Sequence, residues 1–231
     1  MKGVMIGEKH SYNDFGLILS SKEISPPKPQ TKSVDVPMRD GSIDLTEAVA
    51  DEVKFKDRTI TLNFTVIDPV NAWATKISEI QNYLHGQRMK IIFDDDCAFY
   101  YIGRISVNEW KTNKNIGTLV IEGKVEPFKY DVFSSAVDWE WDVFDFEEGI
   151  INETGQLVVD GETTITLICR RKRMFPTFIA SEEMNVTFEG ETYLLKAGKQ
   201  KVYDIFFAEG ENVLTFTGNG TISIDYIGGS L

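Results

Sequence analysis

The stretch Thr59-Ile-Thr-Leu-Asn-Phe-Thr-Val66 alternates polar and apolar side chains over its whole length. Successive side chains of a β-strand point to opposite faces of the sheet, so the apolar residues would share one face. The apolar set is Ile60, Leu62, Phe64 and Val66. The pattern predicts a half-buried strand and sets the class of fold for the first half of the chain.

Other segments of the first half also favour strands. Residues 119–125 alternate in the same way, with apolar side chains on one face and charged ones on the other. Residues 89–93 and 99–102 are rich in aromatic and β-branched side chains, and the polar triplet Asp94-Asp-Asp96 separates them as a turn. These segments predict a sheet in this half of the chain.

One helix is expected within this sheet. Asp68 suits the N-cap, Pro69 suits the first helical position, and Gly86 suits the position just after the helix ends. Between them, apolar residues recur at helical spacing and form one stripe: Val70, Trp73, Ile77, Ile80 and Leu84. Trp73 is expected to anchor the helix in the core.

Residues 20–58 do not fit a regular domain core. Ser20–Pro29 contains three prolines, which remove backbone donors. Two short extended pieces, Val34–Val36 and Ser42–Leu45, then flank a turn at Met38–Gly41. The segment is either a long surface loop or a protruding arm that touches a neighbouring molecule, because compact domains rarely keep long irregular stretches without a use.

The second half predicts strands without a helix. Strands 185–188 and 192–195 flank a Glu-Gly-Glu turn, and strands 212–217 and 221–226 flank a Gly-Asn-Gly turn. Both patterns are typical of β-hairpins. Several short strands separated by glycine-containing turns favour a β-sandwich, with a domain boundary near residues 127–135.

The distribution of charge also divides the chain. Residues 1–130 carry 17 basic against 18 acidic residues, whereas residues 131–231 carry 7 against 18, a net charge of −11. We therefore expect two domains, 1–130 and 131–231, with different surfaces. The acidic domain would repel phosphate, which argues against nucleic acid as a partner.

Composition argues against a membrane protein and against an enzyme. No apolar run approaches the roughly 20 residues that cross a bilayer, and the first residues lack a secretory signal, so we expect a soluble protein made in the cytoplasm. Cys97 and Cys169 are expected to be reduced, part-buried thiols, and His10 and His85 are the two histidines. With neither a CxxC nor an HExxH motif, the sequence predicts no catalytic, metal-binding or cofactor-binding residues.

Two stretches of the second half could form a saccharide or partner surface. Trp139 and Trp141 alternate with acidic residues, and they either stack on sugar rings or pack in a core or interface. Arg170, Arg171 and Arg173 belong to a basic run that could dock on acidic protein or an anionic glycopolymer. The alternative for this run is a solvated loop or a strand edge that cations protect from mis-pairing.

The order and spacing of several stretches resemble the N-terminal domain of the distal tail (Dit) proteins of long-tailed phages and prophages, mostly of Gram-positive hosts. The resemblance spans residues 10–130 and rests on Met38-Arg-Asp-Gly-Ser-Ile-Asp-Leu-Thr46, Val53-Lys-Phe-Lys-Asp-Arg-Thr-Ile-Thr-Leu-Asn-Phe64, Trp73 ahead of Ile80-Gln-Asn-Tyr-Leu-His-Gly86, Met89-Lys-Ile-Ile-Phe93, Tyr100-Tyr-Ile-Gly-Arg104 and Glu122-Gly-Lys-Val-Glu-Pro-Phe-Lys-Tyr130. In the second half, Gly210–Thr221 resembles the closing hairpin of the galectin-like or carbohydrate-module-like sandwich that many Dit proteins carry.

The resemblance implies a mainly β fold: an N-terminal β-sandwich-like domain with one α-helix and an extended arm, and a C-terminal galectin-like β-sandwich. It implies a non-catalytic virion protein that forms a hexameric ring at the distal tail tip. That ring would join the tail tube to the tail-tip and receptor-binding proteins of the baseplate. The alternative function is a carbohydrate-binding module that recognises host cell-wall saccharide directly.

Overall fold

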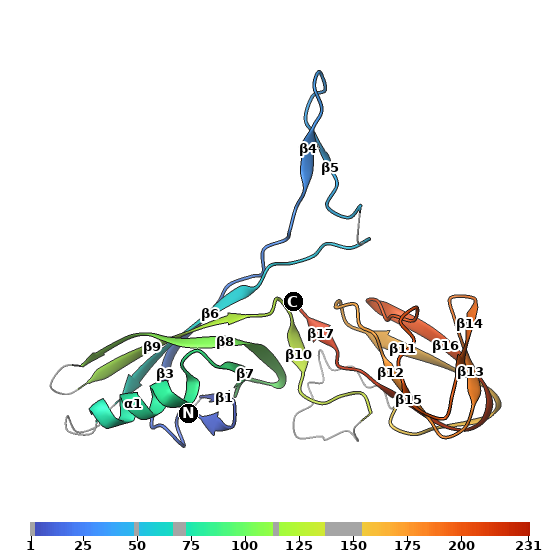
Figure 1. The fold of residues 1–231 in the computed structure, drawn as a ribbon. Coiled ribbons are helices and arrows are strands. Elements are labelled where there is room, and N and C mark those ends of the chain that lie inside the picture. The colour runs from blue at the N-terminus through green and yellow to red at the C-terminus, as the bar shows by residue number, and fades with distance from the viewer. Residues whose placement is uncertain (1–2, 49–50, 67–72, 113–115, 137–153) are drawn as a thin grey trace. The chain divides into compact units, whose positions relative to one another are not determined.

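The computed structural model describes the chain except for residues 1–2, 49–50, 67–72, 113–115 and 137–153 (Figure 1). Over the described residues the protein is mainly β, and it has one helix, α1 (Trp73–Leu84). This confirms the predicted class of fold. No helix within this part of the chain is long and apolar enough to cross a membrane.

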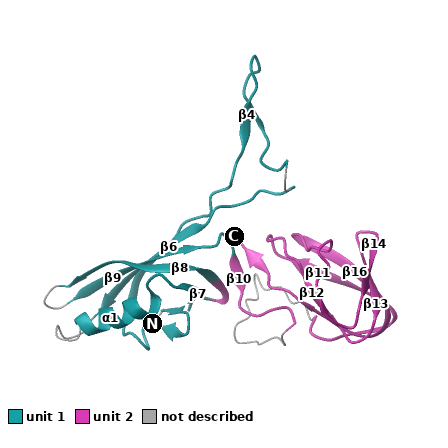
Figure 2. Cartoon of the chain, in the orientation of Figure 1, with its two compact units in different colours: residues 1–96, 101–128 teal, residues 97–100, 129–231 magenta. Residues whose placement is uncertain are grey.

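The chain divides into two compact units (Figure 2). Unit 1 comprises residues 1–96 and 101–128, and unit 2 comprises residues 97–100 and 129–231. The division at residue 128 lies in the region where the charge distribution changes. A short segment of the first half, residues 97–100, belongs to unit 2 because it pairs with a strand that follows the division.

Unit 1 is built on an antiparallel sheet whose strands follow the order β2-β1-β7-β8-β9-β6-β3. The strands are β1 (Val4–Ile6), β2 (Lys9–His10), β3 (Ile18–Ile24), β6 (Arg58–Val66), β7 (Arg88–Phe93), β8 (Asp96–Thr112, of which 97–100 count to unit 2) and β9 (Gly117–Val125). The apolar residues predicted to share one face of β6 are all buried, and β9 alternates in the same register. The prediction for these strands is confirmed.

Helix α1 covers the buried face of this sheet with its predicted apolar stripe. Trp73, Ile77, Ile80 and Leu84 are buried. A Cβ atom on Gly117 would lie 1.8 Å from the Trp73 ring, so the absence of a side chain there lets the indole seat against β9. Gly86, with φ of 76°, follows the helix as expected. The proposed first residues of the helix, Asp68, Pro69 and Val70, lie outside the described residues.

The irregular segment of unit 1 forms an arm. Strands β4 (Ser33–Asp35) and β5 (Ser42–Asp44) pair antiparallel around the predicted turn. An isolated bridge between Pro29 and Phe55 continues the ribbon toward its base. The expected bounds of 20–58 were too wide, because β3 continues to Ile24 and β6 begins at Arg58. We therefore define the arm as residues 25–57.

Unit 2 contains a second antiparallel sheet, in the order β14-β13-β16-β12-β15, with β11 also paired to β16. Its strands are β10 (Lys129–Asp131), β11 (Leu157–Cys169), β12 (Thr177–Ala180), β13 (Met184–Phe188), β14 (Glu191–Leu195), β15 (Gly198–Gln200), β16 (Gly210–Asp225) and β17 (Gly229–Ser230), of which β10 pairs with β17 and with residues 99–100. The predicted β13–β14 hairpin is confirmed. Its turn residues, Glu189 and Gly190, both have positive φ, as a two-residue hairpin turn of this kind requires.

The prediction of a second hairpin was wrong. Residues 212–217 and 221–226 do not fold back on each other; residues 210–225 are one continuous strand, β16. β16 pairs with β11 along the whole length of β11, from Cys169 opposite Gly210 to Leu157 opposite Ile222. Along its other edge β16 pairs first with β13 and then with β12. The Gly-Asn-Gly triplet therefore marks a change of partner within one strand.

The two glycines of this triplet allow a close approach of the chain. Gly218 and Gly220 have φ of 151° and 142°, a region that essentially glycine alone occupies. A Cβ on Gly218 would lie 2.8 Å from the Met184 Cβ, and one on Gly220 would lie 2.6 Å from the Ser181 Oγ. The chain that leads from β12 into β13, from Ser181 to Met184, thus passes close to β16 at two positions where β16 has no side chain.

We predict that Gly218→Ala destabilises the protein by at least about 1–3 kcal/mol, because it combines an unfavourable φ with a steric overlap. Gly161→Ala is the matched control. Gly161 lies opposite Gly218 on β11 and also has positive φ, but no atom lies within 4 Å of its would-be Cβ. Urea unfolding should show a larger loss for Gly218→Ala; equal losses would mean that the close approach is unimportant.

Candidate functional site

The arm is exposed along the whole of its described length. Every described residue from 25 to 57 is exposed or partly exposed, and none is buried. Met38, at the turn, is fully exposed and has a φ of 66°, which is unusual for a residue with a side chain. The arm therefore has no core of its own.

The outer part of the arm is amphipathic. Val34 lies opposite Ile43 in the β4–β5 register, and Val36 and Leu45 follow two residues later, so these apolar side chains share one face. Val34, Val36 and Leu45 are 41%, 38% and 37% exposed, respectively. The opposite face carries Ser33, Asp35, Ser42 and Asp44. We call the face of Val34, Val36, Ile43 and Leu45 the arm's apolar face.

The base of the arm is held by backbone hydrogen bonds. The Lys56 N–H donates to the Lys28 carbonyl and the Gln30 N–H to the Lys54 carbonyl, each at 2.8 Å. The Phe55 ring meets the Phe128 ring edge-on at 6.0 Å between centroids. A two-stranded ribbon is only marginally stable alone in water, and it gains stability when its apolar face packs on something else. The arm's apolar face is thus suited to contact another molecule.

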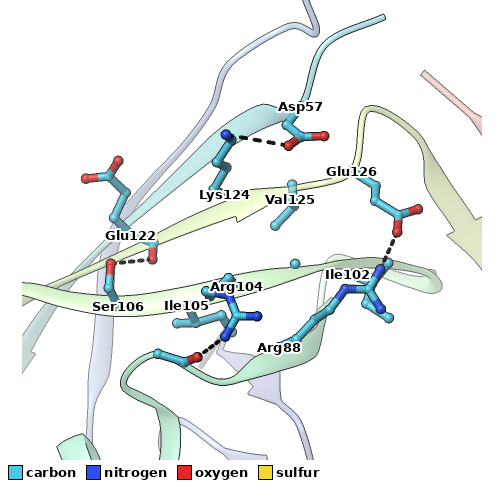
Figure 3. A pocket seen from close by; sticks show the side chains of 12 residues that line it. Asp57, Arg88, Ile102, Arg104, Ile105, Ser106, Glu122, Lys124, Val125 and Glu126 are labelled. Atoms are coloured by element: carbon cyan, nitrogen blue, oxygen red, sulfur yellow. Dashed lines mark hydrogen bonds and ion pairs between the residues drawn. The ribbon is translucent and has the colours of Figure 1, made fainter.

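A depression of about 540 Å³ lies on the sheet of unit 1 (Figure 3). Its charged side chains are paired: Arg88 with Glu126, Lys124 at 3.7 Å from Asp57, Arg104 with the Gly86 carbonyl, and Glu122 with the Asn108 side-chain amide. Its lining residues are Asp57, Gly86, Arg88, Ile102, Gly103, Arg104, Ile105, Ser106, Glu122, Lys124, Val125 and Glu126.

Apart from Ser106, the polar side chains that line this depression are charged. The lining has one hydroxyl group, on Ser106, and that hydroxyl donates to the Glu122 carbonyl at 3.4 Å. It contains neither histidine nor cysteine, and its carboxylates are those of Asp57, Glu122 and Glu126. Within the described parts of the chain, no group of three or more His, Cys, Asp or Glu residues is placed to hold a metal ion.

The cysteines differ in exposure. Cys97 is exposed and Cys169 is buried, so the expected part-burial of both thiols describes neither well. Burial raises the pKa of the Cys169 thiol to about 11, although a hydrogen bond with Tyr226 opposes the shift. The Cys169 thiol is therefore protonated at neutral pH and is not a nucleophile.

The predicted saccharide or partner surface is divided. Trp139 and Trp141 lie outside the described residues, so the interpretation built on them stays a prediction. Arg170, Arg171 and Arg173 lie in unit 2 directly after β11. Arg171 is exposed, and Arg170 and Arg173 contact different neighbours within the unit.

Arg170 is held inside unit 2. Its Nε lies 3.2 Å from the Asp131 Oδ1, its guanidinium lies 4.8 Å from the centre of the Phe99 ring, and its side chain is 13% exposed. The Lys172 ammonium lies 4.1 Å from the centre of the Tyr130 ring. Burial raises the pKa of the Asp131 carboxyl, and the Arg170 guanidinium opposes that shift. These contacts attach the basic run to β10 and to residues 99–100.

Arg173 contacts a group of aromatic residues that sequence reasoning missed. Its guanidinium lies 4.1 Å from the centre of the Phe206 ring. Phe175 lies beside that ring and Tyr203 lies beside Phe175; the two are 46% and 75% exposed. We call Phe175, Tyr203 and Phe206 the aromatic patch. Its members are too far apart in sequence to form a motif.

We predict that Arg170→Ala lowers the free energy of unfolding by about 1–3 kcal/mol at neutral pH, because it leaves the Asp131 carboxylate without its guanidinium. Arg171→Ala, at the exposed neighbouring position, should cost no more than about 1 kcal/mol. Because the native pKa of Asp131 is raised, the folded state keeps this proton to a higher pH than the unfolded chain does. The loss in Arg170→Ala should therefore shrink as pH falls through the native pKa toward the ordinary carboxyl value. Urea unfolding at several pH values measures it, and a pH-independent loss would contradict this assignment.

Comparison with known proteins identifies a solved structure of similar fold. No protein-family profile and no curated protein sequence matches the chain. Among solved structures, the chain is similar to "SPP1 Dit (gp 19.1) Protein, a Paradigm of Hub Adsorption Apparatus in Gram-positive Infecting Phages". The TM-score is 0.62 at 13% sequence identity, and the match covers 98% of this chain and 99% of that chain. The predicted resemblance is thus confirmed at the level of the fold: over nearly its whole length, this chain has the fold of a phage distal tail protein.

Proposed function

We propose that this protein is a structural subunit of the distal tail of a long-tailed phage or prophage. The observation that carries the proposal is the similarity in fold to the SPP1 hub protein across both chains. A match that covers both units argues for the same type of subunit, whereas a single shared sandwich domain would be common to many functions. The features of the arm indicate how such subunits would associate.

The proposed assembly is a hexameric ring in which unit 1 makes the ring and unit 2 carries other tail proteins. A closed ring uses a head-to-tail interface, so each subunit needs two different complementary surfaces. The arm's apolar face supplies one of them, because it is exposed in the single chain and has a firmly held base. A neighbouring subunit that covers this face would stabilise the ribbon and the ring together.

The charges fit this division of roles. The first 130 residues are nearly neutral, so copies of unit 1 can approach without strong repulsion. The second half carries the net charge of −11 and would stay solvated at the periphery. The proposed partners are further copies of the chain, the tail tube, and the tail-tip and receptor-binding proteins.

The test is the mass of the full-length protein in solution, measured by light scattering over a range of concentrations. The wild type should assemble toward a six-chain mass. Val34→Asp should weaken association by about tenfold or more, because it removes apolar contact area and buries a charge. It should leave the stability of the single chain unchanged, because Val34 touches no core.

Ser33→Lys is the control, since it places a charge on the polar face of the same strand, directly opposite Asp44, with which the ammonium can pair. It should assemble like the wild type. A wild type that stays monomeric at every concentration would count against the proposed ring. Equal assembly of Val34→Asp and wild type would instead remove the arm from the interface.

A further inference from the structure

The aromatic patch of unit 2 is exposed but firmly mounted. Tyr203 stands on a turn in which the Ile205 N–H donates to the Val202 carbonyl at 3.1 Å. The Phe175 ring centroid lies 6.4 Å from the Tyr203 centroid and 6.4 Å from the Phe206 centroid. The interplanar angles are 54° and 66°, respectively. The three rings therefore form a tilted group and not a flat platform.

The hydrophobic core supports this group from below. The Phe206 ring contacts the buried Phe188 ring edge-on at 6.4 Å, and the residues on either side of Phe206, Ile205 and Phe207, are fully buried. Phe207 also exchanges backbone hydrogen bonds with Met174, next to Phe175. The Phe206 ring and the backbone next to Phe175 are thus held in position before any partner arrives, which lowers the entropy lost on binding.

Exposed aromatic side chains next to arginine are typical of interface hot spots. In this patch the aromatic system already holds one cation, since the Arg173 guanidinium lies 4.1 Å from the centre of the Phe206 ring. The electron-rich faces of tyrosine and phenylalanine attract cations in this way. Tyr203, at 75% exposure, presents most of its surface to a second cation from outside.

Acidic residues neighbour the patch in sequence, next to Tyr203 and next to Phe188, whose ring contacts Phe206. Asp204 follows Tyr203 on the same turn, and Glu189 and Glu191 lie at the β13–β14 hairpin. Desolvation raises the pKa of the Tyr193 hydroxyl, and the negative charges of Asp204, Glu191 and Glu189 raise it further. A positively charged ligand would be attracted to these carboxylates.

We propose that the aromatic patch binds a lysine- or arginine-bearing segment of a partner protein. The cationic head group would lie over the exposed rings of Tyr203 and Phe175, with the Asp204 carboxylate beside it. The site goes beyond the proposed ring, because its residues all belong to unit 2 and none belongs to the arm. A monomer should bind the segment as the ring does.

The probe is a fluorescently labelled Gly-Arg-Gly-Arg-Gly peptide titrated into the full-length protein and followed by fluorescence anisotropy. Tyr203→Ala should weaken binding about fivefold or more, because cation–π contacts contribute on the order of 1 kcal/mol each. Tyr203→Phe keeps the ring and should bind within about twofold of wild type. Asp204→Asn should weaken binding and reduce its dependence on salt.

Two controls separate the patch from general attraction to an acidic protein. Tyr12→Ala removes another exposed tyrosine, in unit 1, and should bind the peptide like the wild type. The same peptide with citrulline in place of arginine keeps the shape but loses the charge, and it should not bind. Tyr203 and Asp204 are exposed, so these variants are expected to fold normally.

The proposal would be overturned if Tyr203→Ala bound the peptide as well as wild type, if the citrulline peptide bound equally, or if no binding occurred. It would also be overturned if a neutral oligosaccharide such as chitotriose bound at Tyr203 and the peptide did not, because the patch would then be a sugar site. The mass of each sample, measured in parallel, shows separately whether the ring has formed.

Discussion

An apolar β-face in water must be covered, and this constraint explains how the protein is organised. In unit 1, the buried face of β6 and β9 is covered by α1, with Trp73 seated over Gly117. In unit 2, the strands that pair around β16 enclose a core of their own. The β4–β5 ribbon has the same alternation, but Val34, Val36 and Leu45 of its apolar face remain exposed. The feature that is incomplete in the single chain is the one that assembly would complete.

The two exposed surfaces differ in chemistry, and this suggests different partners. The arm's apolar face is aliphatic, which suits a contact that repeats identically around a ring. The aromatic patch combines tilted rings, a guanidinium and nearby carboxylates, which suits a more selective contact with a cationic segment. A subunit with one surface for its own copies and another for a different protein fits the proposed role of a hub.

The basic run shows how a local pattern acquires its meaning from its surroundings. Four consecutive cations in an acidic domain suggest a docking surface. In the structure, Arg170 pairs with Asp131, Lys172 lies over Tyr130, and Arg173 lies over Phe206. These three side chains contact different neighbours within unit 2. Much of its charge contributes to packing within unit 2.

The sequence alone determined the features that depend on local periodicity: the faces of β6 and β9, the buried stripe of α1, the β13–β14 hairpin and the position of the arm. Each of these follows from spacing within a few residues. Tertiary structure decided the features that depend on partners distant in sequence. Gly218 and Gly220 are typical of a turn. In the structure β11 pairs with β16 through both glycines, and β13 and β12 pair with β16 before and after them, so the strand continues. The aromatic patch likewise joins Phe175 to Tyr203 and Phe206, because alternation along a strand fixes which face a side chain takes but not which segment it meets.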